Sequence, residues 1–159
     1  MIFCKIAGAV LLLFSGMLLA SHLNGELERR RAQAVAIEEW LRFVRGQIEC
    51  FSMPIADILR QSGIDVLSRC GYLSEVMPRD LAEMLERSEI YDPNIKEALS
   101  ELAASFGGCY RDEQMKACER CIDKVSQRRE AISRDMPKKK KLNSTLCISA
   151  ALAVAILLV

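Results

Sequence analysis

The chain has 159 residues, of which 51% are hydrophobic and 27% are charged, and its formal net charge is +1. The charged fraction is that of an ordinary soluble domain, so the hydrophobic excess excludes a chain that is soluble throughout. The excess is confined to residues 6–21 and 142–159, which enclose one soluble region, 22–141. That region is long enough for a single small domain with a modest core.

Residues 1–21 are predicted to form an N-terminal transmembrane anchor. As a helix, residues 6–21 cover about 24 Å, slightly less than a hydrocarbon core of roughly 30 Å, and Lys5 can reach the interface. A cleaved signal peptide is the alternative, because a lysine, an apolar stretch and the small residues Ala20 and Ser21 also describe one. The anchor is preferred because the cleavage site lacks a clean A-x-A pattern.

The soluble region 22–141 shows no alternating strand pattern, which predicts an all-α compact bundle of about six helices between the two membrane segments. Its first part carries an apolar seam at spacings of four and three that Pro54 interrupts. We therefore expect helices over about 26–51 and 53–62, with Ser52 as N-cap and Gly63 as C-cap. The seam consists of Ile37, Leu41, Val44, Ile48, Phe51, Ile55 and Ile58.

The second part of the soluble region contains three further predicted helices and one weak stretch. A short helix is expected within 64–76, and another restarts at 77–80 and runs to about Ser88. Asp92 as N-cap, Pro93 at the first helical position and Gly107 just beyond the end predict the next helix. The last helix is expected over 112–135, where Pro137 separates it from the membrane segment.

Residues 142–159 are predicted to form a C-terminal transmembrane helix of about 27 Å. Basic residues gather on the inner flanks of both membrane segments, three at 29–31 and eight in 124–141, which places the soluble region in the cytoplasm. The two segments then pair as a hairpin. Residues 32–123 are acidic, with a net charge of −7, and lipid headgroups attract the basic flank.

Cysteine usage agrees with a reducing compartment, since the seven cysteines form no even framework of the secreted type. The CERC motif places Cys118 and Cys121 on the apolar side of the last helix, where buried filler is the preferred interpretation. A metal or redox site is the alternative, but zinc needs two further ligands and the single histidine, His22, lies at the membrane edge. Gly107-Gly108 lacks the lysine of a phosphate loop.

No catalytic, cofactor-binding or metal-binding residue is therefore predicted, and elimination favours a scaffold over an enzyme. Nucleic acid is not an expected partner, because the four lysines at 138–141 have no interleaved aromatic residue and adjoin a bilayer.

Three stretches follow one another in a familiar order: IECFSMPI at 48–55, FGG at 106–108 with Asp112 and Gln114 after it, and ILLV at 156–159. In this order the chain resembles the stage III sporulation protein AB family. Members have an E-I-x-Y-x-x-x-P-L stretch, an F-G-x-x-L-G region followed by D and Q, and a terminal apolar helix.

The chain also departs from the family pattern. Gln47 and Cys50 stand where the family has Glu and Tyr, and the Leu-Gly step after Phe106 is missing.

The resemblance implies a function, a fold and a location. Family members belong to a channel complex, similar to secretion systems, between mother cell and forespore. The implied partners are an ATPase-like sporulation protein, other channel subunits, membrane lipids and further copies of the chain. The implied cytoplasmic fold is a six-helix bundle similar to the platform proteins of type II secretion and type IV pilus machines, held in the mother-cell membrane.

Two other functions remain as alternatives. The chain is an exported or surface helical domain if residues 1–21 are a cleaved signal peptide. It is a small CxxC redox or metal protein if Cys118 and Cys121 are reactive.

Overall fold

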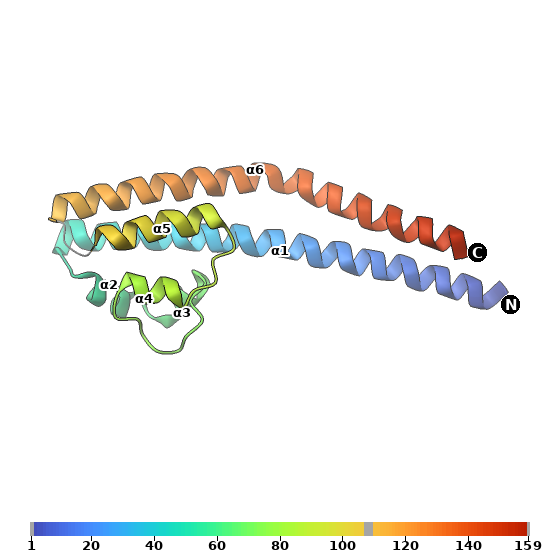
Figure 1. Ribbon diagram of the computed structural model, residues 1–159, viewed down its shortest axis with the longest axis horizontal. Helices are drawn as coiled ribbons and strands as arrows, with labels where there is room; N and C mark the ends of the chain where they lie inside the picture. Colours follow the sequence, from blue (N-terminus) through green and yellow to red (C-terminus); the bar gives the residue numbers. More distant parts are fainter. Residues whose placement is uncertain (1, 107–109, 159) are drawn as a thin grey trace. The chain divides into compact units, whose positions relative to one another are not determined.

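The computed structural model describes residues 2–106 and 110–158, and this part of the chain forms six helices (Figure 1). Within the same residues the only β-pairing is an isolated antiparallel bridge between Tyr72 and Ser88. The predicted all-α class is confirmed. The helices are α1 (Ile2–Phe51), α2 (Ile55–Ser62), α3 (Ile64–Arg69), α4 (Leu81–Glu86), α5 (Pro93–Ser105) and α6 (Arg111–Leu158).

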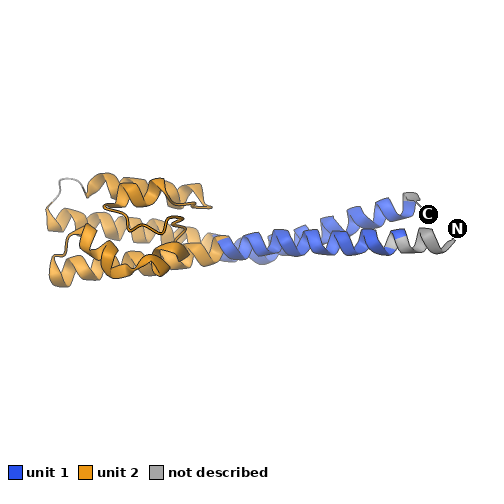
Figure 2. Cartoon of the chain, turned by 90° about the horizontal axis from the view of Figure 1, so that it is seen from below, with its two compact units in different colours: residues 1–29, 132–159 blue, residues 30–131 orange. Residues whose placement is uncertain are grey.

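The chain divides into two compact units (Figure 2). The terminal unit contains residues 1–29 and 132–159, and the body contains residues 30–131. The body lies within the soluble region 22–141 expected from the sequence, and the bounds of that region stay a prediction. The long helices α1 and α6 each contribute residues to both units.

The expected separation of the membrane segments from the bundle helices is wrong. α1 runs unbroken from Ile2 to Phe51, because residues 22–31 contain good helix formers and no proline. α6 likewise runs from Arg111 to Leu158 with Pro137 inside it. Proline removes one backbone hydrogen bond, yet here that loss does not end the helix. The expected membrane segments are thus the ends of the first and last of the six helices.

The turn between α1 and α2 also differs from its prediction. Ser52 is not an N-cap; its φ of 49° places it in the left-handed region, and its N–H donates to Ile48 O at 3.0 Å. It therefore ends α1 as a C-terminal cap. The residue before α2 is Pro54, which makes no side-chain cap. Gly63, with φ of 77°, follows α2 as predicted.

The connection from α3 to α4 is mostly loop. α3 is the short helix expected within 64–76, and it ends at Arg69, because Gly71 with φ of 106° turns the chain away. α4 begins at Leu81, where Asp80 Oδ1 accepts from Glu83 N at 2.8 Å and Glu83 Oε2 accepts from Arg79 N at 2.8 Å. This reciprocal capping explains a helix start just after the predicted 77–80.

α5 begins as predicted. Asp92 Oδ1 accepts hydrogen bonds from Asn94 N at 3.0 Å and Ile95 N at 3.4 Å, and Pro93 is the first helical residue. The helix ends at Ser105. The expected capping residue Gly107 lies outside the described residues.

The core of the body largely follows the predicted apolar seam, although Ile55 is only half-buried and one member of the seam is exposed. Along α1 and α2, Ile37, Leu41, Val44, Ile48 and Ile58 are at most 2% exposed, and α5 buries Ile95, Ala98, Leu99 and Leu102. Trp40 is also buried, and its indole N–H donates to Ser62 Oγ at 3.0 Å. The exposed member is Phe51, which is 68% exposed because α1 ends there and the seam cannot continue.

The terminal unit is a pair of helices in close contact. A Cβ built on Gly16 would lie 2.8 Å from Ala151 Cβ and 3.0 Å from Cys147 O, so only glycine fits here. Ala20 and Ala155 are buried, and Asn24 Nδ2 donates to Ser144 Oγ at 3.3 Å. The predicted hairpin partners are therefore side by side within this unit.

In the described part of the chain, one helix is long and apolar enough to cross a membrane: Val10–Phe51, with a mean hydropathy of 1.4 for its most apolar stretch. Its outer side chains in the terminal unit are exposed, among them Leu11, Phe14 and Leu18. A helix of this kind suits a membrane anchor. Within the described residues, the C-terminal segment is not identified as a second such helix.

Candidate functional site

The CERC motif lies inside the body rather than at a reactive surface. Cys118 and Cys121 are 0% and 3% exposed, and the Cys121 thiol donates to Ala98 O on α5 at 3.5 Å. Burial raises the pKa of the Cys121 thiol to about 12 and that of the Cys118 thiol to about 11. Both thiols are therefore protonated at neutral pH. Their predicted burial is confirmed, and a neutral buried thiol is a poor nucleophile.

A metal centre does not assemble around these cysteines in the residues the structure describes. No group of three or more His, Cys, Asp or Glu side chains gathers there. Among the cysteines that the structure describes, one further thiol is buried: Cys70 is 1% exposed, and burial raises its pKa to about 12. Cys70 lies at the end of α3, far in sequence from the CERC motif and on a different element.

Two buried carboxylates in the body are paired with consecutive arginines of α6. Arg128 Nε lies 2.8 Å from Asp92 Oδ2, and Arg129 Nε lies 2.6 Å from Glu38 Oε2. Glu38 also receives Arg42 Nη2 at 2.6 Å. One side chain of α6 thus reaches the start of α5 and the next reaches α1. Paired carboxylates of this kind hold helices together and are not free for acid–base chemistry.

The buried side-chain amide of Gln33 links α1 to the chain segments before and after α4. Gln33 Nε2 donates to Glu89 O at 2.6 Å and to Cys70 O at 3.3 Å, and its Oε1 accepts from Tyr91 N at 2.9 Å. Gln33 is 7% exposed, so these bonds satisfy a side chain that water does not reach. The network orders the segment between α3 and α5.

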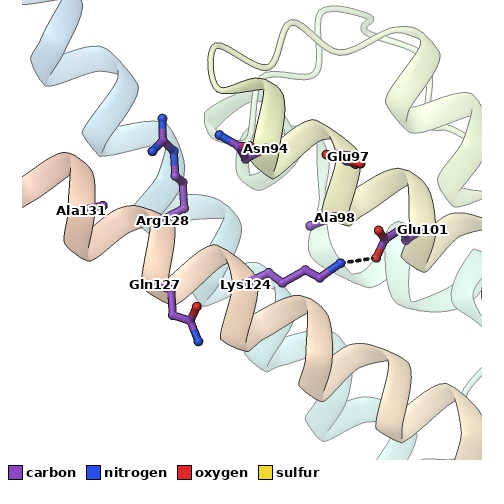
Figure 3. A pocket seen from close by; sticks show the side chains of 8 residues that line it. All are labelled: Asn94, Glu97, Ala98, Glu101, Lys124, Gln127, Arg128 and Ala131. Carbon is purple, nitrogen blue, oxygen red and sulfur yellow. Dashed lines mark hydrogen bonds and ion pairs between the residues drawn. The ribbon is translucent and has the colours of Figure 1, made fainter.

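An open groove of about 390 Å³ runs between α5 and α6 (Figure 3). Asn94, Glu97 and Glu101 stand on the α5 side, and Lys124 from α6 crosses to pair with Glu101. The charges on the two walls balance each other. The groove therefore has no concentrated charge, and its chemistry is that of a solvated helix interface.

Two exposed aromatic side chains lie where α1 ends and where α6 begins. Phe51 closes α1 and is 68% exposed, and Tyr110 precedes α6 and is 86% exposed. Arg111 brings these ends together, because its guanidinium donates to the backbone carbonyls of Ile48, at 3.3 Å, and of Glu49. We call Phe51 and Tyr110 the aromatic end of the body.

The sequence did not predict the roles of Arg128, Arg129 and Gln33. The two arginines belong to the basic run 124–141, which the sequence assigns to the membrane flank, and Gln33 has no distinguishing sequence context. For the ion pair between Arg129 and Glu38 the sequence contains one signal. Glu38 is an acidic residue directly after Ile37, within the stretch that carries the apolar seam. No local signal points from Gln33 to the carbonyl groups it binds 37 and 56 residues away.

A comparison with protein families finds that the family described as stage III sporulation protein AB matches residues 5–159. No curated protein and no solved structure matches the chain.

Proposed function

Because the chain belongs to the stage III sporulation protein AB family, we propose that it is a non-enzymatic membrane platform of a sporulation channel. Membership covers nearly the whole chain and gives it a role in sporulation. The proposal adds that α1 and α6 anchor the protein through residues 1–21 and 142–159. The body is then presented to partners in the mother-cell cytoplasm.

The continuity of α1 supports an uncleaved anchor. A cut after Ser21 would fall in the middle of a 50-residue helix. It would also remove Gly16 and Ala20, which pack against α6 in the terminal unit. A signal peptide is normally separated from the mature domain by a cleavable extended stretch, whereas this segment is built into the fold.

The second anchor is supported by the pairing of the two ends. Residues 142–159 are apolar, follow four lysines and lie against the N-terminal helix in the terminal unit. Their exposed side chains include Leu146, Leu152 and Ile156, which suit contact with lipid. Both inner flanks are basic, so the soluble body is expected in the cytoplasm.

A docking face for an ATPase-like partner is expected at the aromatic end of the body. Two of the regions that carry the resemblance have residues in contact there, because Arg111 binds the carbonyls of Ile48 and Glu49. Exposed aromatic side chains are common centres of protein interfaces. The acidic composition of residues 32–123 favours a partner with a basic surface.

The experiment is a pull-down from sporulating cells with the full chain. We expect an ATPase-like protein and other channel subunits to be recovered with it. Serine at both Phe51 and Tyr110 is expected to reduce recovery of the ATPase. The control carries serine at Leu73 and Val76, which are 71% and 66% exposed on the loop before α4. Equal loss in both variants would overturn the docking face, and no ATPase with the wild type would overturn the platform function.

A further inference from the structure

A second groove lies within the terminal unit, between the two helices that carry the chain ends. It has a volume of about 440 Å³ and is lined by Met17, Ala20, Ser21, Asn24, Gly25, Glu28, Ser144 and Ile148. Sites for small molecules span about 300–1,000 Å³, so the groove is large enough for part of a lipid. The solvated groove between α5 and α6 is in the other unit and shares none of these residues.

The lining of this groove changes from apolar to polar along its length. Met17, Ala20 and Ile148 belong to the apolar segments, whereas Asn24 and Glu28 lie beyond the end of the N-terminal one. Asn24 pairs with Ser144, and Glu28 pairs with Lys140, so the polar part lies where the N-terminal apolar segment ends and the C-terminal one begins. The groove therefore spans the level at which headgroups meet acyl chains.

Positive charge borders the polar part of the groove. Lys141 precedes Ser144 by three residues and so lies on the same face of α6, and its side chain is exposed. Lys138 and Lys139 are also exposed and unpaired among the described residues. The one acid in the lining, Glu28, has its charge balanced by Lys140.

The polar part of the groove also contains a buried oxygen atom without a hydrogen-bond partner and free space beside Gly25. Asn24 Oδ1 is buried and has no hydrogen-bond partner, although its Nδ2 bonds to Ser144. A Cβ built on Gly25 would meet no atom within 4 Å, which shows free space beside the helix at this point. A bound headgroup with hydroxyl groups supplies a donor for that oxygen.

We propose that this groove binds one anionic phospholipid of the phosphatidylglycerol type. One acyl chain lies along Met17, Ala20 and Ile148, and the phosphate lies beside Ser144 and Lys141. Basic pockets between membrane helices on the cytoplasmic side favour anionic headgroups over zwitterionic ones. The inference rests on the membrane placement in the proposed function.

The test uses the full chain in vesicles of equal parts phosphatidylglycerol and phosphatidylcholine, followed by native mass spectrometry of retained lipid. The wild type is expected to retain one phosphatidylglycerol with about tenfold preference. Gly25→Leu fills the free space and should abolish retention. Gly46→Leu is the matched control, because a Cβ there also meets nothing within 4 Å but lies in the body. Lys141→Gln should lower the preference about fivefold.

The outcomes separate the groove from its alternatives. Unchanged retention in Gly25→Leu would overturn the site and assign the preference to diffuse attraction by the lysines. Loss of cross-linking to a channel subunit in Gly25→Leu, with lipid unchanged, would overturn it in favour of a partner helix. Carbonate extraction of the membranes tests the premise. Release of the wild type would overturn both membrane placement and lipid site, whereas retention without lipid preference would overturn the lipid site alone.

Discussion

Arg129 on α6 and Glu38 on α1 form an ion pair inside the body, with Nε of the arginine 2.6 Å from Oε2 of the glutamate. The Glu38 side chain is only 8% exposed, so its charge depends on its partners. Arg42 on α1 provides the second one, at 2.6 Å. The pair thus ties the last helix to the first.

The first prediction follows from this pair. Arg129→Gln leaves the buried Glu38 carboxylate with Arg42 alone and is expected to lower the free energy of unfolding by about 1–3 kcal/mol. The full chain in detergent is measured by chemical denaturation. Arg120→Gln, at an exposed position of the same helix, is the control and should change the free energy by less than about 0.5 kcal/mol. Equal effects of both variants would contradict a structural role for the pair.

A second prediction concerns Gly71. Its φ of 106° is unfavourable for other residues, and an added Cβ would collide with the Gln33 amide and with Glu89 O. Gly71→Ala is expected to cost about 2–4 kcal/mol, because strain and loss of the Gln33 bonds add together. Thermal unfolding measures it, with Gly46→Ala as the control that should be neutral or stabilising by up to about 1 kcal/mol.

Local signals explain which parts of the fold could be predicted. α5 was placed correctly because Asp92 and Pro93 act within one helical turn of themselves. The prediction that Pro137 ends a helix was wrong, because a proline ends a helix only where the residues on both sides of it do not keep the helix together. The predicted helix boundary between residues 21 and 22 was wrong for a related reason. A change from apolar to charged residues alters the surroundings of a helix but not its backbone, and α1 continues through it.

Side-chain partners were less predictable than helices. The burial of Cys118 and Cys121 followed from their spacing beside Val125, which repeats on one face of a helix. The partners of Arg128 and Arg129 depend on how three helices are brought together. A basic run beside an apolar segment has the same composition whether its members face lipid headgroups or buried acids.

The third prediction concerns the buried thiols. Cys118→Ala and Cys121→Ala should each cost at most about 1–2 kcal/mol and leave sporulation intact, because each removes only a small buried side chain. Alkylation at pH 8 checks the raised pKa values: Cys70, Cys118 and Cys121 should react only on unfolding. Stoichiometric zinc in the purified protein, or lost function with an unchanged melting curve, would favour the metal or redox alternative instead.

The same thiols predict a dependence of stability on pH. Their folded pKa values, about 11 to 12, exceed the ordinary value of 9.0, so the folded state holds protons that the unfolded state releases. Stability is therefore unaffected below pH 9 and falls as the pH rises from 9 toward 12. Chemical denaturation at pH 8 and pH 10 measures this. The variant with alanine at both Cys118 and Cys121 should show a smaller loss.

The fourth prediction concerns topology, for which Cys50 is the suitable reporter. It is exposed in the body, whereas Cys70, Cys118 and Cys121 are buried. If the basic flanks set the orientation, a membrane-permeant maleimide should label Cys50 in intact cells and an impermeant one should not. Cys50→Ser is the control for residual labelling. Labelling by the impermeant reagent would place the body outside the cytoplasm and favour the exported alternative.

The last prediction concerns why the chain carries an apolar helix at both ends. A single spanning helix inserts almost irreversibly, so one anchor is enough to hold the protein in a membrane. The second helix is then expected to matter for its contact with the first, where Gly16 lies against Ala151. A truncation after Lys141 removes that contact. It should remain folded and membrane-bound through α1, yet fail to support spore formation.

A point substitution separates the contact from the mere presence of the second helix. Gly16→Ile forces the paired helices apart, because even a Cβ at this position would lie 2.8 Å from Ala151 Cβ. It should reduce spore formation as the truncation does, while Gly8→Ile, where a Cβ meets nothing within 4 Å, should not. Close approach at small residues is a common basis of helix association in membranes. Normal sporulation of the truncated chain would make the second helix a redundant tether, and a soluble truncated chain would show that α1 does not anchor it.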